Sequence, residues 1–79
     1  MWHLYLLECQ DGSFYTGITT NIEKRMYAHA KGTGSKYVAS RGFKSLINSK
    51  PYLTQSDALK AEYRLKQLAK EQKEAWFEK

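Results

Sequence analysis

The alternation of apolar and polar residues predicts three β-strands. The segments WHLYLLE (residues 2–8) and SFYTGIT (residues 13–19) are short and rich in aromatic and β-branched side chains. The Asp11-Gly12 pair between them is typical of a hairpin turn. The segment FKSLINSKPY (residues 43–52) predicts a third strand that ends at Pro51, because proline cannot donate a ladder hydrogen bond.

The remaining apolar positions recur with helical spacing. Thr20-Asn21-Ile22-Glu23 has the form of a capping box with Thr20 as the N-cap, and it predicts a helix over IEKRMYAHAK that Gly32 terminates. The glycine-punctuated segment 32–42 predicts one short helix. From residue 54 or 56 to about residue 70 the pattern is again helical, and EQKEAWFEK predicts a last helical segment.

These elements follow the order β-β-α-(α)-β-α and predict an α/β protein of the α+β sandwich type, with a three-stranded antiparallel sheet flanked by helices. The 79 residues predict a single domain, 1–79. A hydrophobic content of 42% and a charged content of 27% are typical of a folded chain rather than a disordered one. The single Cys9 excludes an internal disulfide, and no apolar run reaches the length of a membrane span, so we expect a cytoplasmic protein without a membrane partner.

The length of the hairpin loop decides where two tyrosines point. A two-residue turn would pair Tyr5 with Ile18 and leave Tyr5 and Tyr15 on opposite faces of the sheet. A three-residue loop over residues 10–12 would pair Tyr5 with Gly17 and bring both phenols to one face. The sequence leaves both registers open. In the second register, Gly17 beneath Tyr5 would leave room for something other than packing.

The net charge of +5 is distributed unevenly. Between residues 24 and 56 there is no acidic side chain, whereas the flanks carry more acidic than basic residues. This pattern is typical of a surface that binds a polyanion, since lysine and arginine release counterions from phosphates. The alternative is that the excess of positive charge only keeps the protein soluble and binds no partner. The basic residues of the segment are Lys24, Arg25, Lys31, Lys36, Arg41, Lys44 and Lys50.

One carboxylate falls on an apolar helix face. Glu62 must be paired, protonated or bound to a cation there, because an isolated buried charge is costly. A salt bridge to a neighbouring lysine or arginine is the simplest explanation. The predicted inward stripe consists of Ala58, Ala61, Glu62, Leu65, Leu68, Ala69 and Gln72.

The first predicted helix carries Arg25 and His29 one turn apart, beside Ile22 and Met26. Taken alone, the arginine can be one that lies at the edge of a core and extends its charge into solvent. The histidine alone can be one whose hydrogen bonds are satisfied within the structure. Together with two tyrosines and Glu62 they form a set suited to phosphodiester hydrolysis. That reaction needs an activated water, a cation on the phosphoryl oxygens and stabilisation of the leaving group.

In this order the residues resemble the GIY-YIG nuclease family. The triplets His3-Leu4-Tyr5 and Tyr15-Thr16-Gly17 resemble the two halves of its signature, and Arg25, His29 and Glu62 match later family positions. The likeness spans almost the whole chain. The segments YLLECQDGSFYTGIT and SDALKAE, together with the SKY motif, are especially similar to its small stand-alone bacterial branch, the UPF0213 proteins.

The resemblance implies a DNA endonuclease that uses a single Mg²⁺ or Mn²⁺ held by Glu62. It implies Tyr5 or Tyr15 as general base, His29 as a relay and Arg25 as the group that stabilises phosphoryl charge. The expected product is a nick with 5′-phosphate and 3′-hydroxyl ends, which suits DNA repair or recombination. We expect DNA, bound for its structure or non-specifically, to contact Lys24, Lys31, Lys36, Tyr37 and Arg41.

The chain departs from the family pattern at two points. Its first triplet is His-Leu-Tyr, and the stretch KEQKEAWFEK lacks the asparagine that members often carry after the metal-binding glutamate. The chain also has no length for a separate targeting domain, so a partner protein or a DNA structure would select the cut. The alternative hypothesis is a nucleic-acid-binding module without catalysis, in which tyrosines stack and Glu62 only forms an ion pair. A protein-interaction domain is the third hypothesis.

Overall fold

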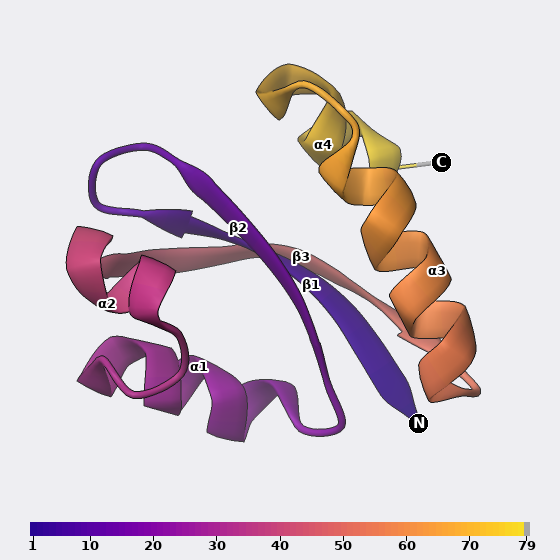
Figure 1. Ribbon diagram of the computed structural model, residues 1–79, viewed down its shortest axis with the longest axis horizontal. Coiled ribbons are helices and arrows are strands. Elements are labelled where there is room, and N and C mark those ends of the chain that lie inside the picture. The colour runs from indigo at the N-terminus through magenta and orange to yellow at the C-terminus, as the bar shows by residue number, and fades with distance from the viewer. Residues whose placement is uncertain (79) are drawn as a thin grey trace.

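The computed structural model describes residues 1–78 and confirms the predicted fold class. Over these residues the three strands form an antiparallel sheet in the order β2-β1-β3. In Figure 1, α1 and α2 lie to one side of the strands and α3 and α4 lie to the other, and we call these the α1/α2 side and the α3/α4 side. The elements are β1 (Trp2–Cys9), β2 (Phe14–Thr19), α1 (Ile22–Lys31), α2 (Lys36–Arg41), β3 (Phe43–Tyr52), α3 (Gln55–Lys66) and α4 (Lys70–Trp76).

The hairpin between β1 and β2 has the three-residue loop. The amide of Gly12 donates to the carbonyl of Cys9 at 3.0 Å, and the amide of Cys9 donates to the carbonyl of Ser13 at 2.8 Å. Gly12 has a φ of 85°, a left-handed conformation that glycine adopts without strain. The register therefore pairs Tyr5 with Gly17, and both tyrosines lie on the same face of the sheet.

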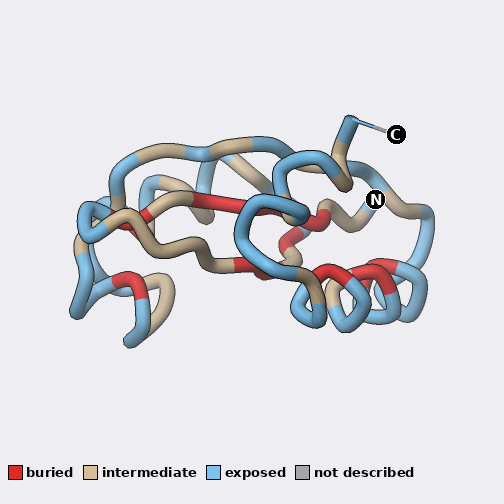
Figure 2. The backbone as a smooth tube through the Cα atoms, turned by 90° about the horizontal axis from the view of Figure 1, so that it is seen from above, coloured by how far each residue is buried: buried red, intermediate tan, exposed pale blue. Residues whose placement is uncertain are grey.

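The central strand β1 is buried on both faces, because successive side chains of a strand point in opposite directions. Figure 2 shows the buried positions along the strands in the interior and on the inner turns of the helices. Buried hydrophobic side chains form a cluster on each face of the sheet. The clusters consist of Tyr5, Leu7, Cys9 and Val38 on the α1/α2 side, and of Leu4, Ala61 and Leu65 on the α3/α4 side.

The cap of α1 differs from the prediction. The N-cap is Asn21 rather than Thr20, and the Asn21 side chain accepts a hydrogen bond from the amide of Lys24. Asparagine is at least as favourable as threonine at this position, so moving the cap by one residue costs the helix nothing. The predicted end of the helix is confirmed, since Gly32 adopts a left-handed conformation with φ 83°.

Two predicted boundaries are also wrong. Strand β3 continues through Pro51 to Tyr52, because it is an edge strand and an edge tolerates the missing amide. The C-terminal helical region breaks after Lys66, so Ala69 and Gln72 are exposed instead of completing the apolar stripe. Within residues 1–78, no helix is sufficiently long and apolar to span a membrane.

Candidate active site

A buried pair of side chains, Tyr5 and His29, forms the centre of the candidate site. The Tyr5 hydroxyl lies 2.8 Å from Nε2 of His29, and each residue is about 1% exposed. Tyr5 comes from β1, and His29 comes from the last turn of α1, one turn after Arg25. The sheet register and the helical spacing therefore bring together two groups that are 24 residues apart in the sequence.

Tyr15 completes an aromatic cluster around this pair. Its ring centroid lies 6.4 Å from that of Tyr5 and 5.6 Å from that of His29, and its side chain is half-buried. On its other side Tyr15 stacks on Tyr37 at 5.7 Å, and the Arg41 guanidinium lies 3.8 Å from the Tyr37 centroid. The two signature tyrosines thus converge, and the stack extends from the buried pair to the surface.

Two glycines let backbone approach this cluster. A Cβ at Gly17 would lie 2.4 Å from the Tyr5 hydroxyl oxygen, so the phenol of Tyr5 itself fills the space that we expected to be free for another group. A Cβ at Gly34 would lie 2.7 Å from Nδ1 of His29. Gly34 was not among the predicted site residues. The only signal was its place just before Ser35, the N-cap of α2.

Arg25 and Glu62 contribute to the electrostatic environment of Tyr5. Burial raises the pKa of Tyr5 to about 12, the neighbouring Tyr15 and the Glu62 carboxylate add to the rise, and the Arg25 guanidinium opposes it. Burial also lowers the pKa of His29, and the positive charge of Arg25 lowers it further. The environment of the Tyr5 phenol therefore includes the other four predicted catalytic and metal-binding residues.

The buried, neutral His29 predicts an acid-sensitive fold. Because its pKa is lower in the folded state than the ordinary 6.5, its contribution to stability is complete above pH 6.5 and is lost as the pH falls below that value. We expect the urea midpoint of the wild type to fall more steeply than that of His29→Gln between about pH 7 and about pH 5. Equal slopes for the two proteins would show that His29 is not held neutral.

Glu62 is the candidate metal ligand. It lies on α3 with its side chain 16% exposed, and its Oε2 lies 3.7 Å from Nζ of the more exposed Lys66. The salt bridge expected for Glu62 is thus present, although an i,i+4 pair at 3.7 Å with a solvated lysine is weak. Among residues 1–78, no group of three or more histidine, cysteine or acidic side chains is placed to hold a metal. Magnesium commonly binds through one or two carboxylates and keeps several waters, so a single glutamate beside a cluster of phenols fits that ion.

The residues predicted to contact nucleic acid lie on α1 and α2. All are exposed, on the elements that cover the tyrosine cluster. Lys24 and Arg25 also line a hollow of about 270 Å³ at the start of α1, together with Asn21. The exposed residues are Lys24, Lys31, Lys36, Tyr37 and Arg41.

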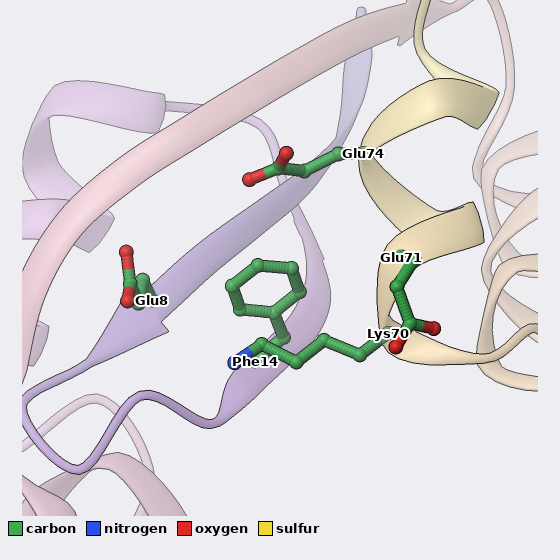
Figure 3. Close-up of a pocket in the computed structure, with 5 residues that line it drawn as sticks. All are labelled: Glu8, Phe14, Lys70, Glu71 and Glu74. Atoms are coloured by element: carbon green, nitrogen blue, oxygen red, sulfur yellow. The ribbon is translucent and has the colours of Figure 1, made fainter.

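A separate hollow of about 450 Å³ lies between the hairpin and α4 (Figure 3). Phe14 and Lys70 contribute to its lining, and the Lys70 amine lies 4.9 Å from the Phe14 ring centroid. The other lining residues are the acidic Glu8, Glu71 and Glu74. Three carboxylates against one amine repel phosphates, so a nucleic acid is not expected to enter here.

Comparison with known proteins identifies relatives over nearly the full length. The family model for the GIY-YIG catalytic domain matches residues 1–75. The UPF0213 protein VNG_2274C of Halobacterium salinarum is 43% identical over 98% of this chain and 100% of its own length. The UPF0213 protein YhbQ of Escherichia coli K12 is 48% identical over 92% of this chain and 73% of its own length. The solution NMR structure of the UPF0213 protein BH0048 from Bacillus halodurans is 40% identical, with a TM-score of 0.57 over 96% of this chain and 82% of that chain.

Proposed function

Because this chain belongs to the family of GIY-YIG catalytic domains, we propose that it is a DNA endonuclease that requires a divalent metal ion. The observation that carries the proposal is the packing of Tyr15 and His29 against the buried phenol of Tyr5, whose pKa also responds to Arg25 and Glu62. A purely structural core does not need to gather two phenols, an imidazole, a guanidinium and a carboxylate.

The burial of each group suggests its role. A general base must reach the attacking water, and Tyr15 is half-buried whereas Tyr5 is about 1% exposed. We therefore assign the base role to Tyr15. Tyr5 and His29 then form a fixed hydrogen-bonded wall that orients the Tyr15 ring, which packs against both.

The two charged groups would act on the phosphate. The Arg25 guanidinium would neutralise charge that develops on the phosphoryl oxygens, where bidentate donation favours arginine over lysine. Glu62 would hold Mg²⁺ or Mn²⁺, which supplies Lewis-acid polarisation of the scissile phosphate when bound. The product would be a nick with a 5′-phosphate and a 3′-hydroxyl, and repair or recombination would use it. The place of the cut would be set by the structure of the DNA or by a partner protein.

A nucleic-acid-binding module without catalysis is the second candidate. Two observations favour it: the stack of Tyr15, Tyr37 and Arg41 resembles a surface for aromatic bases, and the segment after Glu62 lacks an asparagine. The two functions differ in one result. Only the enzyme cuts DNA in a reaction that a metal chelator stops.

The first test is nicking of supercoiled plasmid and of branched oligonucleotides at low salt. We expect cleavage with Mg²⁺ or Mn²⁺, none with a chelator, and a loss on the order of 100-fold in Arg25→Ala. Arg25→Lys keeps the charge and loses the planar fork, so its activity should lie between the two. Salt-dependent DNA binding without any divalent-dependent cleavage would replace the enzyme with the binding module.

A further inference from the structure

Another hollow, of about 460 Å³, lies on the α3/α4 side and contains none of the residues assigned to the reaction. Its volume falls within the range of small-molecule sites and exceeds the space that a single phosphate needs. Ala61 is one of the residues that line the hollow, and the others come from three elements. They are Lys50 and Tyr52 of β3, Asp57, Lys60 and Arg64 of α3, and Trp76 of α4.

The local structure explains why these side chains meet. On α3, Asp57, Lys60 and Arg64 are three and four residues apart and so share one face of the helix. On β3, Lys50 pairs with Leu4 of β1 and lies two residues before Tyr52, so both point to the same side of the sheet.

The aromatic walls of the hollow are anchored. Tyr52 and Trp76 both pack against the cluster of Leu4, Ala61 and Leu65, and Trp76 also contacts Phe77 edge-on at 5.1 Å between centroids. Both side chains are half-buried, so part of each ring remains accessible. They offer flat π surfaces of the kind on which nucleobases stack.

The charge of the hollow is positive. It holds three cationic side chains and one carboxylate, and among residues 1–78 none of the observed ion pairs involves Lys50, Lys60 or Arg64. The two amines and the guanidinium are thus available to a phosphate. The single carboxylate, Asp57, can accept a hydrogen bond from a ribose hydroxyl or from a base amine.

We propose that this hollow binds a nucleotide unit, with its phosphate between Lys60 and Arg64 and its base against Trp76. Lys50 now lies with its amine 5.2 Å from the Trp76 ring centroid. A phosphate attracts an ammonium group more strongly than an aromatic ring does, so the arriving phosphate draws Lys50 away and uncovers the indole for the base. The unit is either a free mononucleotide or one nucleotide of a strand. The site does not depend on cleavage, because it lies apart from the tyrosine cluster.

Fluorescence of Trp76 tests the proposal. Trp2→Phe leaves Trp76 as the single indole of the chain, and stacking of a base on it quenches its emission. We expect AMP to quench saturably, adenosine to bind at least about tenfold more weakly, and inorganic phosphate to compete with AMP. In the same background, Lys60→Ala/Arg64→Ala should weaken AMP about tenfold or more.

The matched control is Lys44→Ala/Lys70→Ala, which removes two cations near the acidic hollow and should change AMP binding less than twofold. If a short oligodeoxyadenylate quenches at lower concentration than AMP, the nucleotide belongs to a strand, and the reverse order identifies a free nucleotide.

Three results overturn the proposal: no quenching by millimolar AMP, quenching by adenosine equal to that by AMP, or full AMP binding in Lys60→Ala/Arg64→Ala. Thermal melts confirm that each variant is folded. None of these measurements requires the chain to cut DNA.

Discussion

Replacing Glu62 by glutamine is expected to lower divalent-dependent nicking about 100-fold or more while the fold is retained. Glutamine has almost the same shape, so the packing of α3 is preserved, but it carries no charge for a metal ion. The ion pair with Lys66 is also lost. The Lys66 side chain is 55% exposed and the pair is long, at 3.7 Å, so its loss should change the free energy of unfolding by only about 0.5 kcal/mol.

The control for this variant is Lys66→Gln. It breaks the same ion pair and leaves the carboxylate in place, so it should retain cleavage. DNA affinity, measured in the absence of metal, should be similar in both variants. If Glu62→Gln and Lys66→Gln were equally impaired, the ion pair rather than a metal site would explain the role of Glu62.

Replacing Gly17 by alanine is expected to damage both stability and activity. The new Cβ would lie 2.4 Å from the hydroxyl oxygen and 2.6 Å from Cζ of Tyr5, closer than atoms can approach. The Tyr5 ring is buried and bonded to His29, so it can move only by breaking that hydrogen bond. We expect a loss of about 1–3 kcal/mol in the free energy of unfolding. A displaced phenol should also lower nicking on the order of 100-fold.

A double-mutant cycle separates this mechanism from a general effect on β2. Tyr5→Phe removes the hydroxyl, and with it both the tightest contact of the new methyl group and the bond to His29. Gly17→Ala should therefore cost less in the Tyr5→Phe background than in the wild type. Additive effects of the two substitutions, measured by urea unfolding, would contradict the clash.

The sequence predicted the fold class because short, local patterns control it. Each strand has a clear composition, and Gly32 and the Asp11-Gly12 pair act through backbone conformations that few other residues adopt. Boundaries were less predictable. Asn21 and Thr20 are both good N-caps, and the tolerance of Pro51 depends on β3 lying at an edge, which is a property of the whole sheet.

The sequence proposed residues for the candidate site but did not determine how they are arranged. The sequence suggested the predicted set of residues, whereas the hydrogen bond between Tyr5 and His29 required the register of the hairpin. That set is Tyr5, Tyr15, Arg25, His29 and Glu62. The register in turn depends on whether the hairpin loop has two or three residues, and the sequence left both lengths open. Gly34 was missed because its role is to leave space for an imidazole, and such close approaches have no local signature.

The composition of β3 has a consequence for how the protein behaves when it is concentrated. An edge strand presents unpaired backbone groups to which a strand of another molecule can add. Here that edge carries the exposed Lys44 and Lys50 and a proline, Pro51, that has no amide hydrogen to offer. A second copy that approached edge to edge would meet like charges and an interrupted hydrogen-bonding row. This edge of the sheet is thereby protected against pairing with another molecule, and the protection comes from three side chains.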